Sequence, residues 1–166
     1  MTATTTCAPR SPRHGAIASV VLAGIAGGLV DFVYASAVGL IHGRPVITVW
    51  QGVAGGWLGP EVGKGGIATA ALGVVTHFGI ALTFAGVFAL AATRIKALYP
   101  RPVLAGVSYR LALDAVMYAI VLPLRWPAIF PKWDGVQSLT DIASHIGVGL
   151  VISLMLSRAA GASHDG

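Results

Sequence analysis

Residues 16–41 form a long apolar segment, AIASVVLAGIAGGLVDFVYASAVGLI, in which Asp31 is the only charged residue. A transmembrane helix needs about 20 predominantly apolar residues, so this segment is long enough to cross a bilayer. Three later segments are comparable: 67–92, 103–124 and 139–156. The last is the shortest, and Thr140 and Asp141 lie near its start. The sequence therefore predicts an all-α membrane protein, a bundle of four transmembrane helices.

Rare polar residues recur in the same order in the two halves of the chain. Each half contains an aspartate, a tryptophan, a histidine and an arginine: Asp31, Trp50, His77 and Arg94, then Asp114, Trp133, His145 and Arg158. The first half carries an insert of about fifteen residues between its tryptophan and its histidine. We expect two hairpin repeats, 16–94 and 103–158, that run in the same direction. They would form one membrane domain, 16–158, between disordered tails at 1–15 and 159–166.

The composition excludes several classes of function. Hydrophobic residues make up 55% of the chain and charged residues 10%, so four apolar segments leave no room for a separate soluble catalytic domain. The only cysteine, Cys7, excludes an internal disulfide and a cysteine-based metal cluster. No catalytic triad, metal-ligand cluster or phosphate-binding loop is recognisable, and we expect no enzyme activity, metal or cofactor. The net charge of +5 is interpreted as contact with anionic lipid, not with nucleic acid.

A secretory signal is an alternative interpretation of the N-terminal region. Arg10 and Arg13 precede an apolar run, and Ala35-Ser36-Ala37 imitates a small-residue cleavage site. However, the run is long for a signal core and contains Asp31. Its removal would also delete the segment that matches the third one. We therefore favour a retained transmembrane helix.

Basic residues and tryptophans indicate the orientation in the membrane. One side would carry Arg10, Arg13, Arg94, Lys96, Arg101 and Arg158. The opposite loops hold Arg44, Lys64, Arg125 and Lys132, partly offset by Glu61, Asp134 and Asp141. By the positive-inside rule, both termini are expected in the cytoplasm. All four tryptophans then lie in the two external loops, where their rings suit the lipid headgroup layer.

The loop after the first segment contains a short apolar stretch, 49–58, that cannot cross a bilayer. It is rich in glycine and is followed by the helix-breaking run 59–66. We expect an interfacial or shallow re-entrant helix here. With the second external loop, it could form an interfacial lid over the bundle, made of Trp50, Gln51, Trp57 and Trp133. The alternative, that both loops only float at the interface, stays open.

Five charged or titratable residues are expected to meet near the middle of the membrane: Asp31, His77, Arg110, Asp114 and His145. Three of them lie about ten residues, or about 15 Å, from the outer ends of their segments, with His145 nearer the outside. Small residues such as Gly28 and Gly73 share their helix faces, as in closely packed membrane helices. Ionised groups at that depth cost about 2.5–3.5 kcal/mol or more unless paired. Arg110 and Asp114 can pair directly, and Asp31 needs His77 or Arg110 as partner.

The charges of this cluster suggest a function. Two carboxylates face one obligate cation, so the balance can come from a proton on an aspartate or histidine or from a bound cation. Our hypothesis is proton- or cation-linked permeation or transport of a small solute, with a homodimer expected because four helices are few for a pathway. Asp31 would be the acceptor, and His77 and His145 its titrating partners.

Two other functions are compatible with the same residues. The protein can be a structural or accessory membrane subunit whose paired charges only fix the helix register. It can also be a haem protein for electron transfer, since His77 and His145 occupy equivalent places in the two halves. Against haem, bulky Phe78 and Ile146 follow the histidines, and no arginines for the propionates are evident.

Several short motifs resemble those of a known group of membrane proteins. They are GLVD (28–31), WQGVAGGWLG (50–59), GG (65–66) with TAALG (69–73), and HF (77–78). Together they resemble the YagU-like proteins, small bacterial inner-membrane proteins with four spans, over most of the chain. The resemblance implies a four-span architecture in the bacterial inner membrane, with the lipid bilayer as partner. It implies no particular activity, substrate or cofactor.

Overall fold

The computed structural model describes residues 12–128 and 130–162, and every regular element in them is helical. The elements are α1 (Pro12–Ile41), α2 (Val46–Leu58), η1 (Pro60–Gly65), α3 (Gly66–Arg94), α4 (Pro102–Val116), η2 (Met117–Val121), α5 (Leu122–Arg125) and α6 (Val136–Ala162). Here η1 is a short 3-10 helix, and η2 is a π-helical stretch between α4 and α5. The predicted all-α class is confirmed for the described residues.

Four helical segments are long and apolar enough to cross a membrane: Gly15–Ile41, Pro60–Arg94, Pro102–Arg125 and Val136–Ala162. The prediction of four membrane-length helices is therefore confirmed. The fourth extends beyond the expected segment at both ends, and its polar first turns are paired: Asp141 accepts hydrogen bonds from Tyr34 and Gln137. Helix also extends into both expected tails, from Pro12 and to Ala162, and the remaining tail residues lie outside the described part of the chain.

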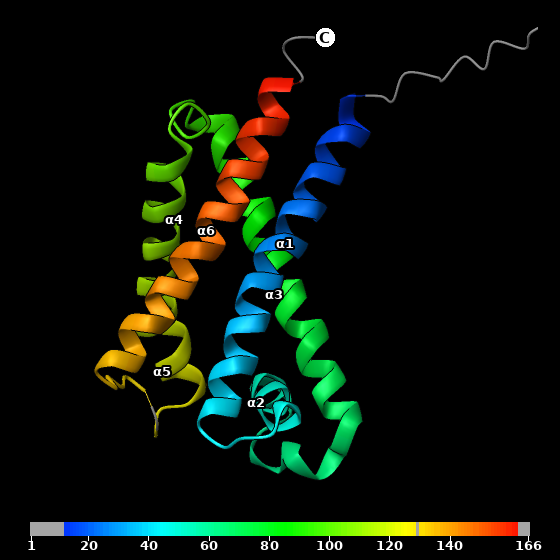
Figure 1. Ribbon diagram of the computed structural model, residues 1–166, viewed down its shortest axis with the longest axis vertical. Coiled ribbons are helices and arrows are strands. Elements are labelled where there is room, and N and C mark those ends of the chain that lie inside the picture. Colours follow the sequence, from blue (N-terminus) through cyan, green and yellow to red (C-terminus); the bar gives the residue numbers. More distant parts are fainter. Residues whose placement is uncertain (1–11, 129, 163–166) are drawn as a thin grey trace, which may run out of the picture.

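The long helices form an antiparallel bundle in which α1 lies between α3 and α6, and α4 packs against α6 (Figure 1). The start of α1 and the end of α6 lie at one end, called here the terminal end. Helices α2 and α5 lie at the other, called the α2 end. Near the terminal end α3 and α4 touch, since the Tyr109 hydroxyl donates to the Phe84 carbonyl at 2.8 Å. Toward the α2 end, α3 and α5 are separated.

Both hairpins cross where small residues allow close approach. In the α4–α6 pair, a Cβ on Gly149 would overlap the carbonyl oxygen of Gly106. In the α1–α3 pair, a Cβ on Gly28 would lie 2.9 Å from the Phe78 ring and 3.0 Å from the Ala81 Cβ. Lipid gives no hydrophobic drive for helix association, so such close packing supplies much of the attraction between membrane helices.

An apolar core fills the terminal half of the bundle. Its buried members are Ala23, Ala85, Phe88, Ala105, Val148, Ile152 and Leu156. Phe88 is fully buried and stands edge-on to Tyr109, with ring centroids 5.3 Å apart. The terminal half is therefore closed by packed side chains drawn from all four long helices.

Helix α2 has 13 residues, about 20 Å of helix, which is too short for the roughly 30 Å core of a bilayer. It packs along the first half of α3, where Gly73 lies against the Trp50 carbonyl so closely that a Cβ would overlap it. The Trp50 ring is buried and stacks on Phe32 of α1 at 4.4 Å. Gln51 donates to the Gly66 carbonyl at 2.8 Å. Helix α2 is thus fastened to α3 and α1.

The third membrane segment is interrupted by a wide turn. In η2 the Leu122 amide donates to the Met117 carbonyl, five residues earlier. Pro123 follows directly, and a proline has no amide hydrogen and crowds the carbonyl four residues before it. Such π-helical turns are frequent at functional sites. Here the turn begins at Met117, three residues after Asp114, and supplies Tyr118 to the cavity described below.

Candidate functional site

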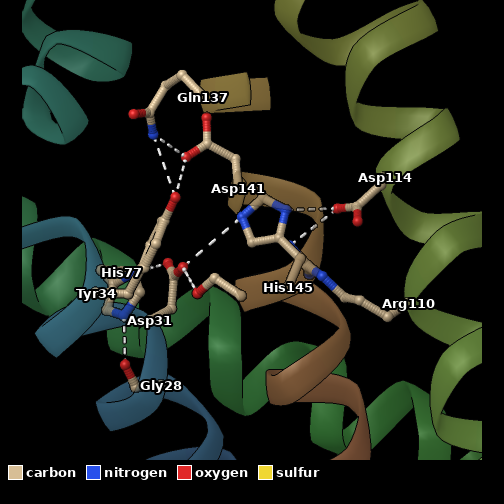
Figure 2. A network of polar contacts seen from close by, with 10 residues as sticks. Gly28, Asp31, Tyr34, His77, Arg110, Asp114, Gln137, Asp141 and His145 are labelled. Carbon is tan, nitrogen blue, oxygen red and sulfur yellow. Dashed lines mark hydrogen bonds and ion pairs between the residues drawn. The ribbon is translucent and has the colours of Figure 1, made fainter. Parts of the chain in front are cut away.

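A chain of charged and titratable side chains crosses the bundle through four helices (Figure 2). On α3, His77 Nδ1 lies 3.9 Å from Asp31 Oδ2 on α1. The other oxygen of Asp31 lies 3.8 Å from His145 Nε2 on α6. His145 Nδ1 is 3.0 Å from Asp114 Oδ1 on α4, which also contacts Arg110 Nη2 at 3.0 Å. The structure therefore brings together all five residues that were expected to converge.

The pairing differs in part from the expected one. Arg110 and Asp114 form the predicted pair between residues four apart. Asp31 lies beside His77 and His145, its two predicted titrating partners, whereas Arg110, the alternative ion-pair partner, contacts Asp114 instead. The expected offset in depth does not keep His145 away, because its ring reaches both carboxylates.

Both ends of this chain are more shielded than its middle, and His77, at one end, is 14% exposed. The side chains of Arg110 and Asp114 are 8% and 11% exposed, against 22% for Asp31 and 28% for His145. The Arg110 guanidinium also lies over the Phe84 ring, 5.2 Å from its centroid, which favours a cation. The Arg110–Asp114 pair is thus fixed inside the protein, whereas Asp31 and His145 can be reached from outside it.

The hydrogen bonds of the two histidines constrain the protons. A carbonyl only accepts, so His77 Nε2, 2.8 Å from the Gly28 carbonyl, must carry a hydrogen. His145 has a carboxylate beside each ring nitrogen. A neutral imidazole has one N–H and can serve only one of them, while its other lone pair faces a negative oxygen. An additional proton, on His145 or Asp31, removes this conflict.

A second polar group lies next to the chain and was not predicted as part of the site. The Tyr34 hydroxyl and the Gln137 amide both donate to Asp141 Oδ1, each at 2.7 Å (Figure 2). The sequence signal for it was available on α6, where Gln137, Asp141 and His145 recur every four residues and therefore share one face. Ser144 adds a hydrogen bond to Asp31 Oδ1 at 3.3 Å.

Both groups border a cavity of about 570 Å³ that opens at the α2 end. Asp31 and His145 form its floor, and Tyr34, Gln137 and Asp141 form its wall. Its mouth is lined by exposed residues of the loops and of the end of α1: His42, Arg44, Lys132 and Asp134. The remaining lining comes from the outer part of α1, from Val49 of α2, from η2 and α5, and from Phe130. The cavity therefore connects one end of the bundle with the polar chain.

The four residues expected to form a lid do not lie together over this cavity. Trp50 and Gln51 are buried between α2 and its neighbours, and the Trp50 ring stands edge-on to His77 at 5.0 Å. Trp57 is 70% exposed and donates to Thr76 on α3, and Trp133 is 63% exposed. None of the four lines the cavity. Trp50 instead packs against the His77 ring.

The histidines do not fit haem ligation. Two axial imidazoles must face each other across the flat porphyrin, whereas His77 and His145 contact opposite oxygens of the single Asp31 carboxylate. His77 Nε2 is also occupied by the Gly28 carbonyl. Within the described residues, no group of three or more His, Cys, Asp or Glu side chains is arranged to hold a metal ion.

Comparison with protein-family models, with curated proteins and with solved structures found no match to this chain.

Proposed function

We propose that this protein binds a small solute or ion inside a membrane-embedded bundle and couples that binding to the movement of a proton or cation. The observation that carries the proposal is the position of His145, which joins two carboxylates at the floor of a cavity open at one end. A side chain that can bind and release a proton is thereby placed between the protein interior and a space that a solute can enter.

The charge of the five-residue chain supports the coupling. Asp31 and Asp114 are negative and Arg110 is positive, so the chain carries one uncompensated negative charge when both histidines are neutral. One proton on His77, His145 or Asp31 brings the sum to zero, and so does one bound monovalent cation. An uncompensated charge is costly at this depth, so the protein has a physical reason to take up one or the other.

The closed terminal half suggests how the solute would move. The apolar core lies between the polar chain and the terminal end, so the cavity is accessible from one end only in this state. Passage to the other side then needs a rearrangement of the helices, within one chain or in a homodimer. We place a hinge at η2, because this turn borders the cavity directly beyond Asp114.

The architecture and location belong to the same proposal. We propose two hairpin repeats, α1–α3 and α4–α6, because each contributes one aspartate–histidine pair, and α2 as an interfacial helix. We also propose a bacterial inner-membrane protein with cytoplasmic termini, supported by the basic residues near the terminal end and by the YagU-like motifs. The cavity would then open to the outside.

A structural role is the second candidate. It is favoured by the Arg110–Asp114 pair, since a buried pair at 3.0 Å can serve to fix the register of α4 alone. In that case Asp31 and the cavity would have no solute to bind, and the protein would act as an accessory subunit.

Proton flux into proteoliposomes with an internal pH dye tests the proposal. Gradients of H⁺, Na⁺ and K⁺ are imposed in turn on vesicles that contain the wild type, Asp31→Asn or Glu61→Gln. Glu61 is an exposed control that pairs with Lys64 away from the cavity. We expect flux above that of empty vesicles, its loss in Asp31→Asn, and no change in Glu61→Gln. Helix content and thermal unfolding in detergent confirm that the variants are folded.

Two results would contradict transport. One is wild-type flux equal to empty vesicles under all three gradients. The other is Asp31→Asn flux equal to wild type, which removes Asp31 from the mechanism. If Asp31→Asn instead fails to fold, the structural role is favoured.

A further inference from the structure

We infer that the cavity binds a small organic cation, an alkylammonium, between Asp141 on its wall and Asp31 on its floor. This inference rests on the proposed function, because it names the class of solute for the same site. It is carried by the order of charges along the cavity, the hydrogen bonds of Asp141 and the apolar and aromatic lining.

The charges along the cavity favour a cation in its deeper part. Among the residues that line it, Lys and Arg occur only at the mouth, as Arg44 and Lys132, and Lys132 is paired with Asp134 at 2.7 Å. Arg110 lies behind the floor and is engaged with Asp114. An anion in the deeper part would therefore meet two carboxylates without a guanidinium or ammonium group, whereas a cation would be attracted by both.

The Asp141 carboxylate is oriented by hydrogen bonds that leave its negative charge uncompensated. Its Oδ1 takes hydrogen bonds from two neutral groups, Tyr34 and Gln137, which orient the carboxylate without neutralising it. No Lys, Arg or His in the described part of the chain forms an ion pair with Asp141. An oriented and uncompensated carboxylate on a cavity wall is a binding site for an ammonium group.

The rest of the lining suits an organic cation better than a metal ion. The rings of Tyr34, Tyr118 and Phe130 border the cavity, and aromatic faces attract ammonium groups. Val38 and Leu122 add alkyl surface for a short hydrocarbon chain. A metal ion needs several converging ligands, and the described residues contain no group of three or more such side chains.

The ammonium group and the proton that balances the five-residue chain would compete for Asp31 at the floor of the cavity. Asp31 is faced by His77 from α3, by His145 and Ser144 from α6, and, through His145, by the Arg110–Asp114 pair of α4. Asp141 adds a further carboxylate to the cavity, so the ammonium group is shared between Asp31 and Asp141, and a cation beside Asp31 disfavours a proton there by electrostatic repulsion. The proposed coupling thus becomes an exchange of alkylammonium for a proton.

Isothermal titration of the detergent-purified full chain tests the ligand class with three molecules of one shape. They are propylammonium, propionate and 1-propanol, which carry a positive, a negative and no charge. We expect saturable binding of propylammonium only. Asp141→Asn should weaken it at least tenfold, and Tyr34→Phe, which keeps the carboxylate but removes one of its donors, a few-fold. Glu61→Gln should bind like wild type.

The outcomes separate this inference from the proposed function. Propylammonium binding that fails in Asp141→Asn, without any flux in proteoliposomes, supports the ligand class and contradicts transport. Proton flux that needs Asp31 but shows neither binding of nor inhibition by propylammonium contradicts the ligand class and leaves transport standing. Equal binding of propionate or propanol, or an Asp141→Asn variant that binds as tightly as wild type, also overturns the inference.

Discussion

The two aspartate–histidine pairs of this bundle are built alike and supported differently. In the second hairpin, Asp114 and His145 lie 3.0 Å apart, and Arg110 neutralises the carboxylate from one turn below. In the first, Asp31 and His77 are 3.9 Å apart, and Gly27 occupies the place equivalent to Arg110. A Cβ on Gly27 would already lie 3.0 Å from Ile152, so the packing leaves no room for an arginine there.

An arginine beside one carboxylate and a glycine at the corresponding position beside the other give the two aspartate–histidine pairs different charge balances. The pair with an arginine has its charge balanced inside the protein. Each pair contributes one residue to the cavity, Asp31 from the first and His145 from the second, and Asp31 has no arginine beside it. The Arg110–Asp114 pair itself is shielded inside the protein, with side chains 8% and 11% exposed.

The largest loss of stability is expected when the positive charge of Arg110 is removed. Arg110→Met leaves Asp114 buried without its obligate partner, which costs about 3–5 kcal/mol of stability for buried pairs. The exposed Arg158→Met, on α6 near the terminal end, should change stability by less than about 0.5 kcal/mol. Unfolding in mixed detergent micelles, followed by helix content, measures both. Equal losses in the two variants would contradict the assignment of Arg110 as the structural cation.

A smaller effect is expected at the tryptophans that match in the two halves. Trp50 is 3% exposed and stacks on Phe32, whereas Trp133 is 63% exposed. Trp50→Ala should cost about 2 kcal/mol, below the roughly 3–5 typical of water-soluble cores, because lipid replaces water as the alternative environment. Trp133→Ala should cost less than about 0.5 kcal/mol. The same unfolding assay measures both variants. A larger loss of stability in Trp133→Ala than in Trp50→Ala would mean that α2 does not depend on the contact between Trp50 and Phe32.

The smallest effect is expected when either His145 or His77 is replaced by glutamine. His145→Gln removes the side chain that can bind a proton between the two carboxylates, so proton flux should lose most of its dependence on pH. His77→Gln keeps a donor for the Gly28 carbonyl, so its flux should fall only a few-fold and keep its pH profile. Flux measured at a series of pH values in proteoliposomes gives both curves. A flat profile in His77→Gln with an unchanged one in His145→Gln would reverse the roles of the two histidines.

The convergence of the polar residues could be predicted because it follows from their depth in the membrane and from the free-energy cost of a charged group in lipid. Asp31, Arg110 and Asp114 had to avoid lipid, and the four-residue spacing of Arg110 and Asp114 favoured a direct pair. The double contact of His145 could not be predicted, since it depends on the rotation of α6 against both α1 and α4. Asp141 is visible in the sequence as a charge near the start of the shortest apolar segment, but its partners Tyr34 and Gln137 lie on two different helices.

The sequence alone determined the environment, the number of membrane-length helices and the set of side chains that needs shielding, because apolar length and the cost of charge in lipid are local properties of a segment. Only the tertiary structure decided which carboxylate meets which histidine, that Trp50 is buried beside His77, and that a cavity ends at Asp31. Those features depend on the angles at which helices cross, and these are set by contacts such as Gly106 with Gly149 between residues far apart in the chain.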